Sequence, residues 1–262
     1  PPTLPGTDVT LTADDGYPLS ARLHAPDGPA RASAVIHGAT ATPRRYYDRF
    51  AAWLASRGYR VLTYDYRGVG GSRPASLRGF TATMRDWAER DAAAAVRWLR
   101  GAHPGDPLLM VAHSFGGQSL GLSDALHDVD GAVMVGVQLG WVGHWPALSR
   151  ARLALVWHVA FPLSLALFGY VPGWAGLGED LPPGVAREWA SWCTSPGYLT
   201  DAVPVAASRF ARFRAPVLYY SFTDDDFAPG RAVRSYLSAL SGARVTHRRL
   251  RPEDLGAAEV GH

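Results

Sequence analysis

Short apolar segments alternate with helical ones along most of this chain, and no other feature of the sequence constrains the fold as strongly. The apolar segments have the length of strands, and most are followed by residues with the spacing of an amphipathic helix. Such an alternation predicts a mostly parallel sheet with helices on both faces. The expected strands of this sheet are residues 32–38, 59–68, 107–114, 131–138, 215–222 and 243–250.

Turn signals and apolar spacing place the remaining elements. Residues 8–26 are expected to form two strands around the Asp15-Gly16 turn, ahead of the parallel strands. Helical spacing is strongest over residues 81–101, where Met84 and Trp98 lie roughly along one side. Further helices are expected at residues 44–58, 115–128 and 230–241.

One long segment, residues 139–214, separates two of the expected core strands. A connection of this length without structure of its own is uncommon. We therefore expect it to form a helical cap over a core made of residues 1–138 and 215–262. Ligands bind beyond the carboxyl ends of the strands in such sheets, so the cap is expected to cover a crevice there.

Tryptophan is concentrated in this expected cap. Aromatic side chains at a boundary between cap and core favour an apolar pocket with few polar anchors. We expect Trp141, Trp145 and Trp192 to contact the substrate. The alternative is that the rings only hold the cap in place. The six tryptophans of the segment, out of nine in the chain, are Trp141, Trp145, Trp157, Trp174, Trp189 and Trp192.

The apolar residues 153–172 have the length of a membrane-spanning helix. Pro162 and His158 argue against a span, and so does the position of the segment between strands of one sheet. We expect a buried or cap helix pair here, and no transmembrane span.

Composition excludes several classes of protein. Hydrophobic residues make up 47% of the chain and charged residues 19%, which indicates a sizeable core and not a disordered chain. The basic residues are all arginine and are scattered, so no nucleic-acid partner is expected. Cys193 is the single cysteine, which excludes an internal disulfide. No signal-peptide pattern is visible, and we expect a cytoplasmic protein.

Ser114 stands at the end of the expected strand 107–114, in the sequence Ala-His-Ser-Phe-Gly. This sequence fits the G-x-S-x-G pattern, except that Ala112 replaces the first glycine. In that pattern a sharp turn between strand and helix exposes the serine hydroxyl, and small residues let the backbone segments approach each other. Ser114 is therefore the candidate nucleophile.

A serine nucleophile needs a base, and the base needs a carboxylate to orient it. In this topology the chain order is Ser, Asp or Glu, then His. His262 is the candidate base. Asp225 lies four residues before Pro229 and is the preferred acid, with Asp224 and Asp226 as alternatives.

The oxyanion of the reaction needs backbone N–H donors. One is expected from Phe115, directly after the nucleophile. The second is expected from Ala39, which follows the early strand 32–38.

The segments VIHGAT, YDYRGVGGS, VAHSFGGQ, PVLYYSFTDDDFAP and the final GH stand in the order and spacing of an α/β-hydrolase. Over nearly its whole length the chain resembles bacterial α/β-hydrolases related to the serine aminopeptidase and monoglyceride-lipase group. The resemblance implies an α/β-hydrolase fold with a serine triad, which on matching positions falls on Ser114, Asp225 and His262.

Other residues with chemical potential have simpler explanations. His37 is expected to shape its turn, and His113 to pack or form hydrogen bonds locally inside the serine turn. Ser72 is expected to belong to the loop after strand 59–68. The acidic residues of 127–130 fit a helix end and turn, so we expect no metal and no cofactor.

The sequence thus predicts a serine hydrolase that cleaves a hydrophobic carboxylic ester through an acyl-enzyme, with lactones and amides as related targets. Its expected partner is a small, hydrophobic, ester-like substrate. One alternative is an acyltransferase that uses the same triad. Another is a non-catalytic small-molecule-binding protein on the same fold, because fold does not fix function.

Overall fold

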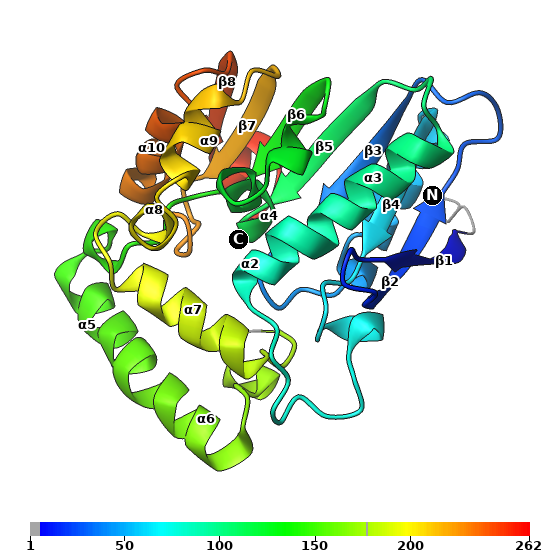
Figure 1. Cartoon of the computed structure of the whole chain (residues 1–262). Helices are drawn as coiled ribbons and strands as arrows, with labels where there is room; N and C mark the ends of the chain where they lie inside the picture. Colours follow the sequence, from blue (N-terminus) through cyan, green and yellow to red (C-terminus); the bar gives the residue numbers. More distant parts are fainter. Residues whose placement is uncertain (1–5, 177) are drawn as a thin grey trace.

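The computed structural model describes residues 6–176 and 178–262. Its centre is an eight-stranded sheet with the strand order β1-β2-β4-β3-β5-β6-β7-β8 (Figure 1). The first two strands pair antiparallel with each other, β2 pairs antiparallel with β4, and the pairs from β4 to β8 are parallel. This confirms a mostly parallel sheet with a leading hairpin. The strands are β1 (Thr7–Thr12), β2 (Pro18–His24), β3 (Ala32–His37), β4 (Tyr59–Tyr64), β5 (Leu108–His113), β6 (Gly131–Val135), β7 (Val217–Phe222) and β8 (Val245–Leu250).

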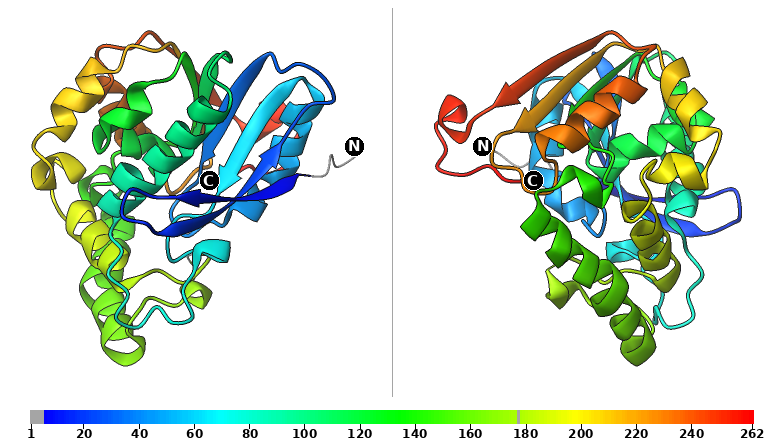
Figure 2. Two further views of the ribbon diagram at one scale, coloured as in Figure 1. Left: turned by 45° about the vertical axis from the view of Figure 1, so that its right-hand side comes forward. Right: turned by 90° about the vertical axis from the view of Figure 1, so that its left-hand side faces the viewer.

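Helices cover both faces of the sheet, as expected. Helix α1 (Asp48–Ser56) lies on one face, whereas α3 (Ala93–Ala102) and α4 (Phe115–Gln118) lie on the other (Figures 1 and 2). Alternate residues of a strand point to opposite faces, so neighbours in β3 join different clusters. Ile36 packs in the smaller cluster beneath α1, and Val35 packs in the main core.

The expected helix 81–101 is a continuous helical run from α2 (Met84–Asp86) through a π-helical segment (Trp87–Ala92) into α3. It begins at Met84 because Thr83 caps it. The Thr83 side chain accepts the Asp86 N–H, and the Asp86 carboxylate accepts the Thr83 N–H. This reciprocal pairing satisfies donors that have no acceptor inside the helix.

The expected helix 115–128 is wrong beyond Gln118, where α4 ends and short 3₁₀ turns follow. Close packing explains the glycines that interrupt it. A Cβ on Gly116 would lie 2.1 Å from the carbonyl oxygen of His37, and one on Gly121 would lie 2.5 Å from the Phe210 ring. Glycine is a weak helix former, so the packing requirement takes precedence over helix length.

Residues 139–214, here called the helical insertion, contribute no strand to the sheet within the described part of the chain. Figure 1 shows α5 to α7 beyond the carboxyl ends of the central strands. After the insertion, α10 (Gly230–Ala239) leads to β8. The helices of the insertion are α5 (Ala147–Leu155), α6 (Phe161–Phe168), α7 (Pro183–Cys193), α8 (Leu199–Ala202) and α9 (Ala206–Arg212).

The apolar segment is neither buried nor a pair of helices. A π-helical segment (Val156–Ala160) joins α5 to α6, so that Ala147–Phe168 is one run of 22 residues. Only 11% of its most apolar stretch is buried, and among the described residues it is the one helix whose length and composition would suit a membrane span. Pro162 is accommodated in the first turn of α6.

Candidate active site

Ser114 occupies a strained turn between β5 and α4. Its backbone has φ 51° and ψ −115°, a conformation that side chains other than glycine rarely adopt. The turn is held because the Ser114 N–H donates to the Val135 carbonyl at 3.0 Å. Small neighbours are required here, since Ala112 is fully buried and Gly116 touches the backbone of His37. Strain of this kind concentrates at functional sites.

Asp225 and His262 form a hydrogen-bonded pair in the loops that follow β7 and β8. The distance between His262 Nδ1 and Asp225 Oδ2 is 2.8 Å. The other carboxylate oxygen, Oδ1, accepts the N–H groups of Phe227 at 2.9 Å and Ala228 at 2.8 Å. The buried carboxylate therefore fixes the ring from the Nδ1 side, which leaves Nε2 as the nitrogen free to exchange a proton.

The two neighbouring aspartates have other contacts. Asp224 accepts the backbone N–H groups of Val260 and Gly261, and these hydrogen bonds lower the pKa of its carboxyl group. It thus holds the segment that carries His262. The Asp226 carbonyl accepts the indole N–H of Trp145 at 2.8 Å. Of the three candidate acids, Asp225 is the one in contact with the histidine.

Ser114 and His262 line the same cavity, of about 370 Å³. Within the described residues their side chains are not hydrogen-bonded to each other, so the structure brings them to one cavity without joining them. No arginine, aspartate or glutamate is among the described residues that line it. Its apolar lining comes from Ala39, Ala41, Pro43, Tyr46, Trp189 and Phe227.

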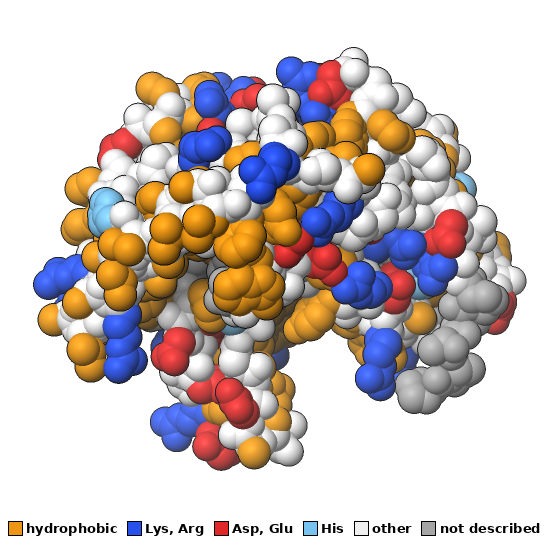
Figure 3. Space-filling view, turned by 90° about the horizontal axis from the view of Figure 1, so that it is seen from below, with side chains coloured by type: hydrophobic (Ala, Val, Ile, Leu, Met, Phe, Trp, Pro, Cys, Tyr) orange, Lys and Arg blue, Asp and Glu red, His pale blue; other side chains and the backbone are white. Residues whose placement is uncertain are grey.

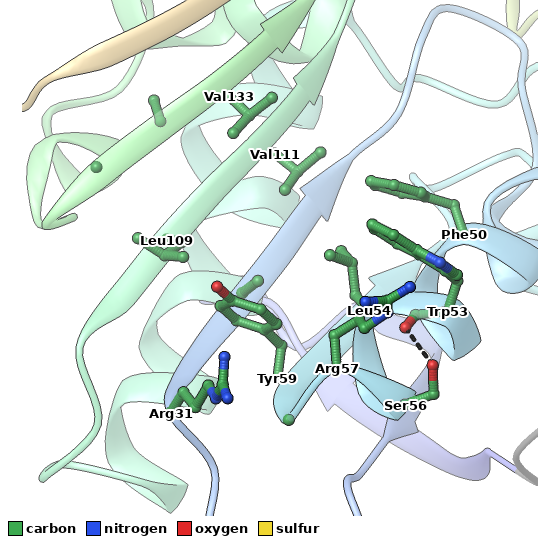
Figure 4. A pocket seen from close by; sticks show the side chains of 14 residues that line it. Arg31, Phe50, Trp53, Leu54, Ser56, Arg57, Tyr59, Leu109, Val111 and Val133 are labelled. Atoms are coloured by element: carbon green, nitrogen blue, oxygen red, sulfur yellow. Dashed lines mark hydrogen bonds between the residues drawn. The ribbon is translucent and has the colours of Figure 1, made fainter.

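A larger cavity, of about 760 Å³, lies elsewhere, against the sheet face that α1 covers only in part. In Figure 4 the rings of Phe50 and Trp53 stand opposite Leu109, Val111 and Val133 of the sheet. None of the predicted catalytic residues lines it. We therefore take the smaller cavity, which Ser114 and His262 line, as the candidate active site.

The two predicted oxyanion donors differ in their surroundings. Phe115 begins α4, and the first N–H groups of a helix have no acceptor within it. The Ala39 N–H, by contrast, donates to the hydroxyl of Tyr47 at 2.8 Å. The same hydroxyl lies 2.9 Å from His113 Nδ1. In the structure the Ala39 N–H is therefore paired with a side chain, and its role as an oxyanion donor stays a prediction.

The three tryptophans predicted to contact substrate do not line the cavity among the described residues. Trp192 is buried against Tyr198, and Trp141 packs edge-on against His144. Trp145 contacts the Asp226 carbonyl, as described above. The tryptophan that does line the cavity is Trp189, three residues before Trp192 in the same helix.

Two further residues support the site without being recognisable from a motif. Gly136 has φ 59°, and a Cβ there would lie 3.1 Å from Cε1 of His262. Tyr47 holds Ala39 and His113, as above. In the sequence, Gly136 could be recognised only as a glycine at the end of a strand, and Tyr47 only as an aromatic residue at the start of a helix.

Burial keeps His37 and His113 neutral. Burial lowers the pKa of His37 to about 3 and that of His113 to about 4. Nδ1 of His37 is 2.8 Å from the Tyr64 hydroxyl. Ser72 is buried, and its hydroxyl donates to the Asp65 carbonyl at 2.8 Å, which suits a loop residue and not a nucleophile.

A parallel sheet of this order, with a serine elbow after β5 and an Asp–His pair after its last strands, defines an α/β-hydrolase. The chain belongs to the serine aminopeptidase S33 family, whose family model matches residues 28–164. This confirms the resemblance inferred from the sequence motifs. An uncharacterized protein of Mycobacterium tuberculosis, strain H37Rv, is 28% identical over 241 residues, which cover 89% of this chain and 79% of the relative.

Solved structures confirm the fold. A soluble variant of monoglyceride lipase from Saccharomyces cerevisiae, in complex with a substrate analog, superposes with a TM-score of 0.65 at 14% identity, covering 96% of this chain and 89% of that one. A thermostable carboxyl esterase from Bacillus coagulans gives a TM-score of 0.63 at 13% identity, covering 95% and 91%. At these identities the likeness concerns the fold alone.

Proposed function

We propose that this protein is a serine hydrolase that cleaves a hydrophobic carboxylic ester through an acyl-enzyme intermediate. The observation that carries the proposal is that the strained Ser114 lines one cavity together with His262, whose ring is hydrogen-bonded to Asp225. A serine held in such a turn, next to a histidine oriented by a carboxylate, is the arrangement that acyl transfer requires.

Each residue has a defined role in the proposed reaction. Ser114 Oγ attacks the ester carbonyl while His262 Nε2 accepts the hydroxyl proton and then donates it to the leaving alcohol. Asp225 keeps the proton of His262 on Nδ1 and stabilises the imidazolium that forms. The N–H groups of Phe115 and Ala39 stabilise the oxyanion, and the Ala39 N–H exchanges the Tyr47 hydroxyl for it. Water, deprotonated by His262, then cleaves the acyl-enzyme and releases the acid.

The lining of the cavity supports a neutral substrate. An aminopeptidase has to bind the free ammonium group of a peptide, and a buried charge needs a partner. The described lining contains no aspartate or glutamate that could pair with it. Apolar side chains there favour an acyl chain, at about 0.8 kcal/mol per buried methylene.

An ester panel on the wild type and on Ser114→Ala tests this function. The panel holds p-nitrophenyl esters of increasing acyl length and aminoacyl p-nitroanilides. We expect the medium-chain esters to be cleaved fastest, and Ser114→Ala to lose at least about 10³-fold in kcat/KM. Unchanged melting temperature serves as the control for folding.

Faster cleavage of the anilides would contradict the substrate assignment, and ester cleavage retained by Ser114→Ala would contradict the nucleophile. Adding an excess of a primary alcohol separates hydrolysis from the acyltransferase alternative. Hydrolysis predicts mainly free acid, whereas an acyltransferase would yield mainly the new ester.

A further inference from the structure

The helical run Ala147–Phe168 has two unlike sides. On its inner side Trp157 and Phe161 are buried and pack against Trp189, with ring centroids 5.0 and 6.2 Å away. On its outer side large apolar side chains are exposed to solvent, for example Leu148 at 67% and Leu155 at 61%. The run is therefore attached to the protein along one side only.

On the outer side exposed apolar side chains recur along the run, four of them at intervals of four residues from Leu155 to Leu167, and this set is here called the exposed stripe. Of the thirteen exposed large hydrophobic side chains in the described residues, six lie on this one run. Seen from below, hydrophobic side chains cover much of the side of the molecule where α5 and α6 lie (Figure 3). Contiguous patches of this kind mark interaction surfaces. The exposed stripe consists of Leu148, Leu155, Val159, Leu163, Leu167 and Phe168.

The charged side chains of the run itself are of one sign. Residues 147–168 contain no aspartate or glutamate. Arg150 and Arg152 are exposed and form no ion pair with any other described residue. The nearest acidic residues along the chain after the run, Glu179 and Asp180, are paired with arginines. The surface thus presents a hydrophobic stripe with positive charge at the α5 end.

Aromatic residues stand at the other end of the run. Trp174 is 80% exposed and lies edge-on to Phe168, with 6.2 Å between ring centroids. Exposed tryptophan is costly in water but favourable at the level of lipid headgroups. Hydrophobic length, basic flank and terminal tryptophan together match a helix that lies in a membrane interface.

We propose that the exposed stripe docks on an anionic lipid surface, with the helical run lying parallel to it. The run lies on the surface and does not span the bilayer, because Trp157 and Phe161 are seated in the protein and His158 is exposed near its middle. Leucine and valine side chains enter the acyl boundary, while Arg150 and Arg152 contact lipid phosphates.

This docking places the candidate active site next to the lipid. The inner side of the run packs on Trp189, and Trp189 lines the cavity that holds Ser114. A hydrophobic ester taken up from the lipid would then reach the cavity beside Trp189. That link rests on the proposed function, whereas lipid binding itself does not, and the two are measured separately.

Vesicle co-sedimentation of the full chain tests the docking. The probes are vesicles of phosphatidylcholine alone and of phosphatidylcholine mixed with phosphatidylglycerol. We expect the double variant Leu155→Glu, Leu163→Glu to bind at least about ten-fold more weakly. The matched control, Val205→Glu with Leu255→Glu, changes side chains that are similarly exposed outside the stripe and should bind as the wild type does.

The arginines are tested with the double variant Arg150→Gln, Arg152→Gln. Each arginine near an anionic surface strengthens partitioning of the protein onto the membrane by about five-fold. This variant should therefore lose affinity for the mixed vesicles but not for vesicles of phosphatidylcholine alone. Ser114→Ala should bind both kinds of vesicle as the wild type does. Failure of the proposed hydrolase function would leave these binding results unchanged.

Three outcomes would overturn the docking proposal. The wild type could fail to bind either kind of vesicle. Alternatively, the Leu155→Glu, Leu163→Glu variant and its control, Val205→Glu, Leu255→Glu, could lose the same amount of binding. Sedimentation equilibrium could also show a dimer that the Leu155→Glu, Leu163→Glu variant dissociates. In that last case the exposed stripe is an interface between copies of this chain.

Discussion

Strand β3 and the helical run Ala147–Phe168 are both apolar, but the protein uses them in opposite ways. All six residues of β3 are buried, whereas most of the helical run is exposed. The strand is enclosed by helices from both sides of the sheet, and the run is covered on one side only. Apolar composition therefore shows that a segment avoids water, but not which partner shields it.

The core and the helical insertion also differ in what they contribute to the candidate active site. The proposed nucleophile, base and acid all lie at the ends of strands, held by backbone hydrogen bonds and by close glycine packing. The helical insertion contributes one ring, Trp189, to the described lining of the cavity. Changes in the core should therefore affect catalysis and stability, and changes in the insertion should affect substrate and surface binding.

The largest loss of activity is expected at Asp225, and a much smaller one at its neighbour Asp224. Asp225→Asn should lower kcat by about 10³- to 10⁴-fold, because an amide stabilises the wrong tautomer of the histidine. Asp224→Asn should lower it far less, because its carboxylate acts only through the Val260 and Gly261 N–H groups. The measurement is kcat on the best ester of the panel, with the melting temperature of each variant.

Equal losses in the two variants would contradict the assignment of Asp225 as the triad acid. A larger loss in Asp224→Asn would mean that the position of the segment carrying His262 matters more than the orientation of its ring.

Stability should depend on pH through the buried histidines of the core. Burial lowers the pKa of His37 to about 3, and its Nε2 has no hydrogen-bond partner in the described residues. In the unfolded chain a histidine titrates near 6.5, so protons bind the unfolded state more tightly. The free energy of unfolding should fall by about 1.4 kcal/mol per pH unit for each such histidine as pH drops below about 6.5.

Urea unfolding at several pH values between about 7 and 5 measures this slope. His37→Gln should reduce it, and His158→Gln, on the exposed helical run, should leave it unchanged. A stability that stays constant over this range would show that the buried histidines gain protons without cost.

The smallest effect on the kinetics is expected for a change in the helical insertion. Trp189→Ala should raise KM for long acyl esters about ten-fold more than for acetate, since two methylenes that lose their contact account for about that factor. Trp174→Ala is the matched control, because Trp174 is exposed and does not line the cavity. An equal increase for long and short esters would show that Trp189 only holds the insertion in place.

The sequence was sufficient to predict those parts of the site whose position follows from the order of the strands and helices. The order of strands and helices brings Ser114, Asp225 and His262 to one edge of the sheet, because carboxyl ends of parallel strands meet there. Asp225 was preferred over its neighbours from its distance to Pro229, and its contact with His262 agrees with that choice.

The parts that depend on side-chain direction could not be predicted. Trp189 and Trp192 lie in one helix and differ only in the side they face, which a list of tryptophans does not reveal. Tyr47 pairs with Ala39 across a turn, a contact that no motif specifies. The composition of the apolar run 153–172 would be the same whether it were buried or exposed. Its burial depends on the elements that pack against it, and the sequence does not show these.

The central claim is that Ser114 is the nucleophile of a covalent mechanism. Its most direct test is to treat the protein with a fluorophosphonate and to locate the adduct by peptide mass spectrometry. We expect one adduct, on Ser114, in stoichiometric amount. An adduct on another residue such as Ser72, or a folded protein that takes up no label, would contradict it.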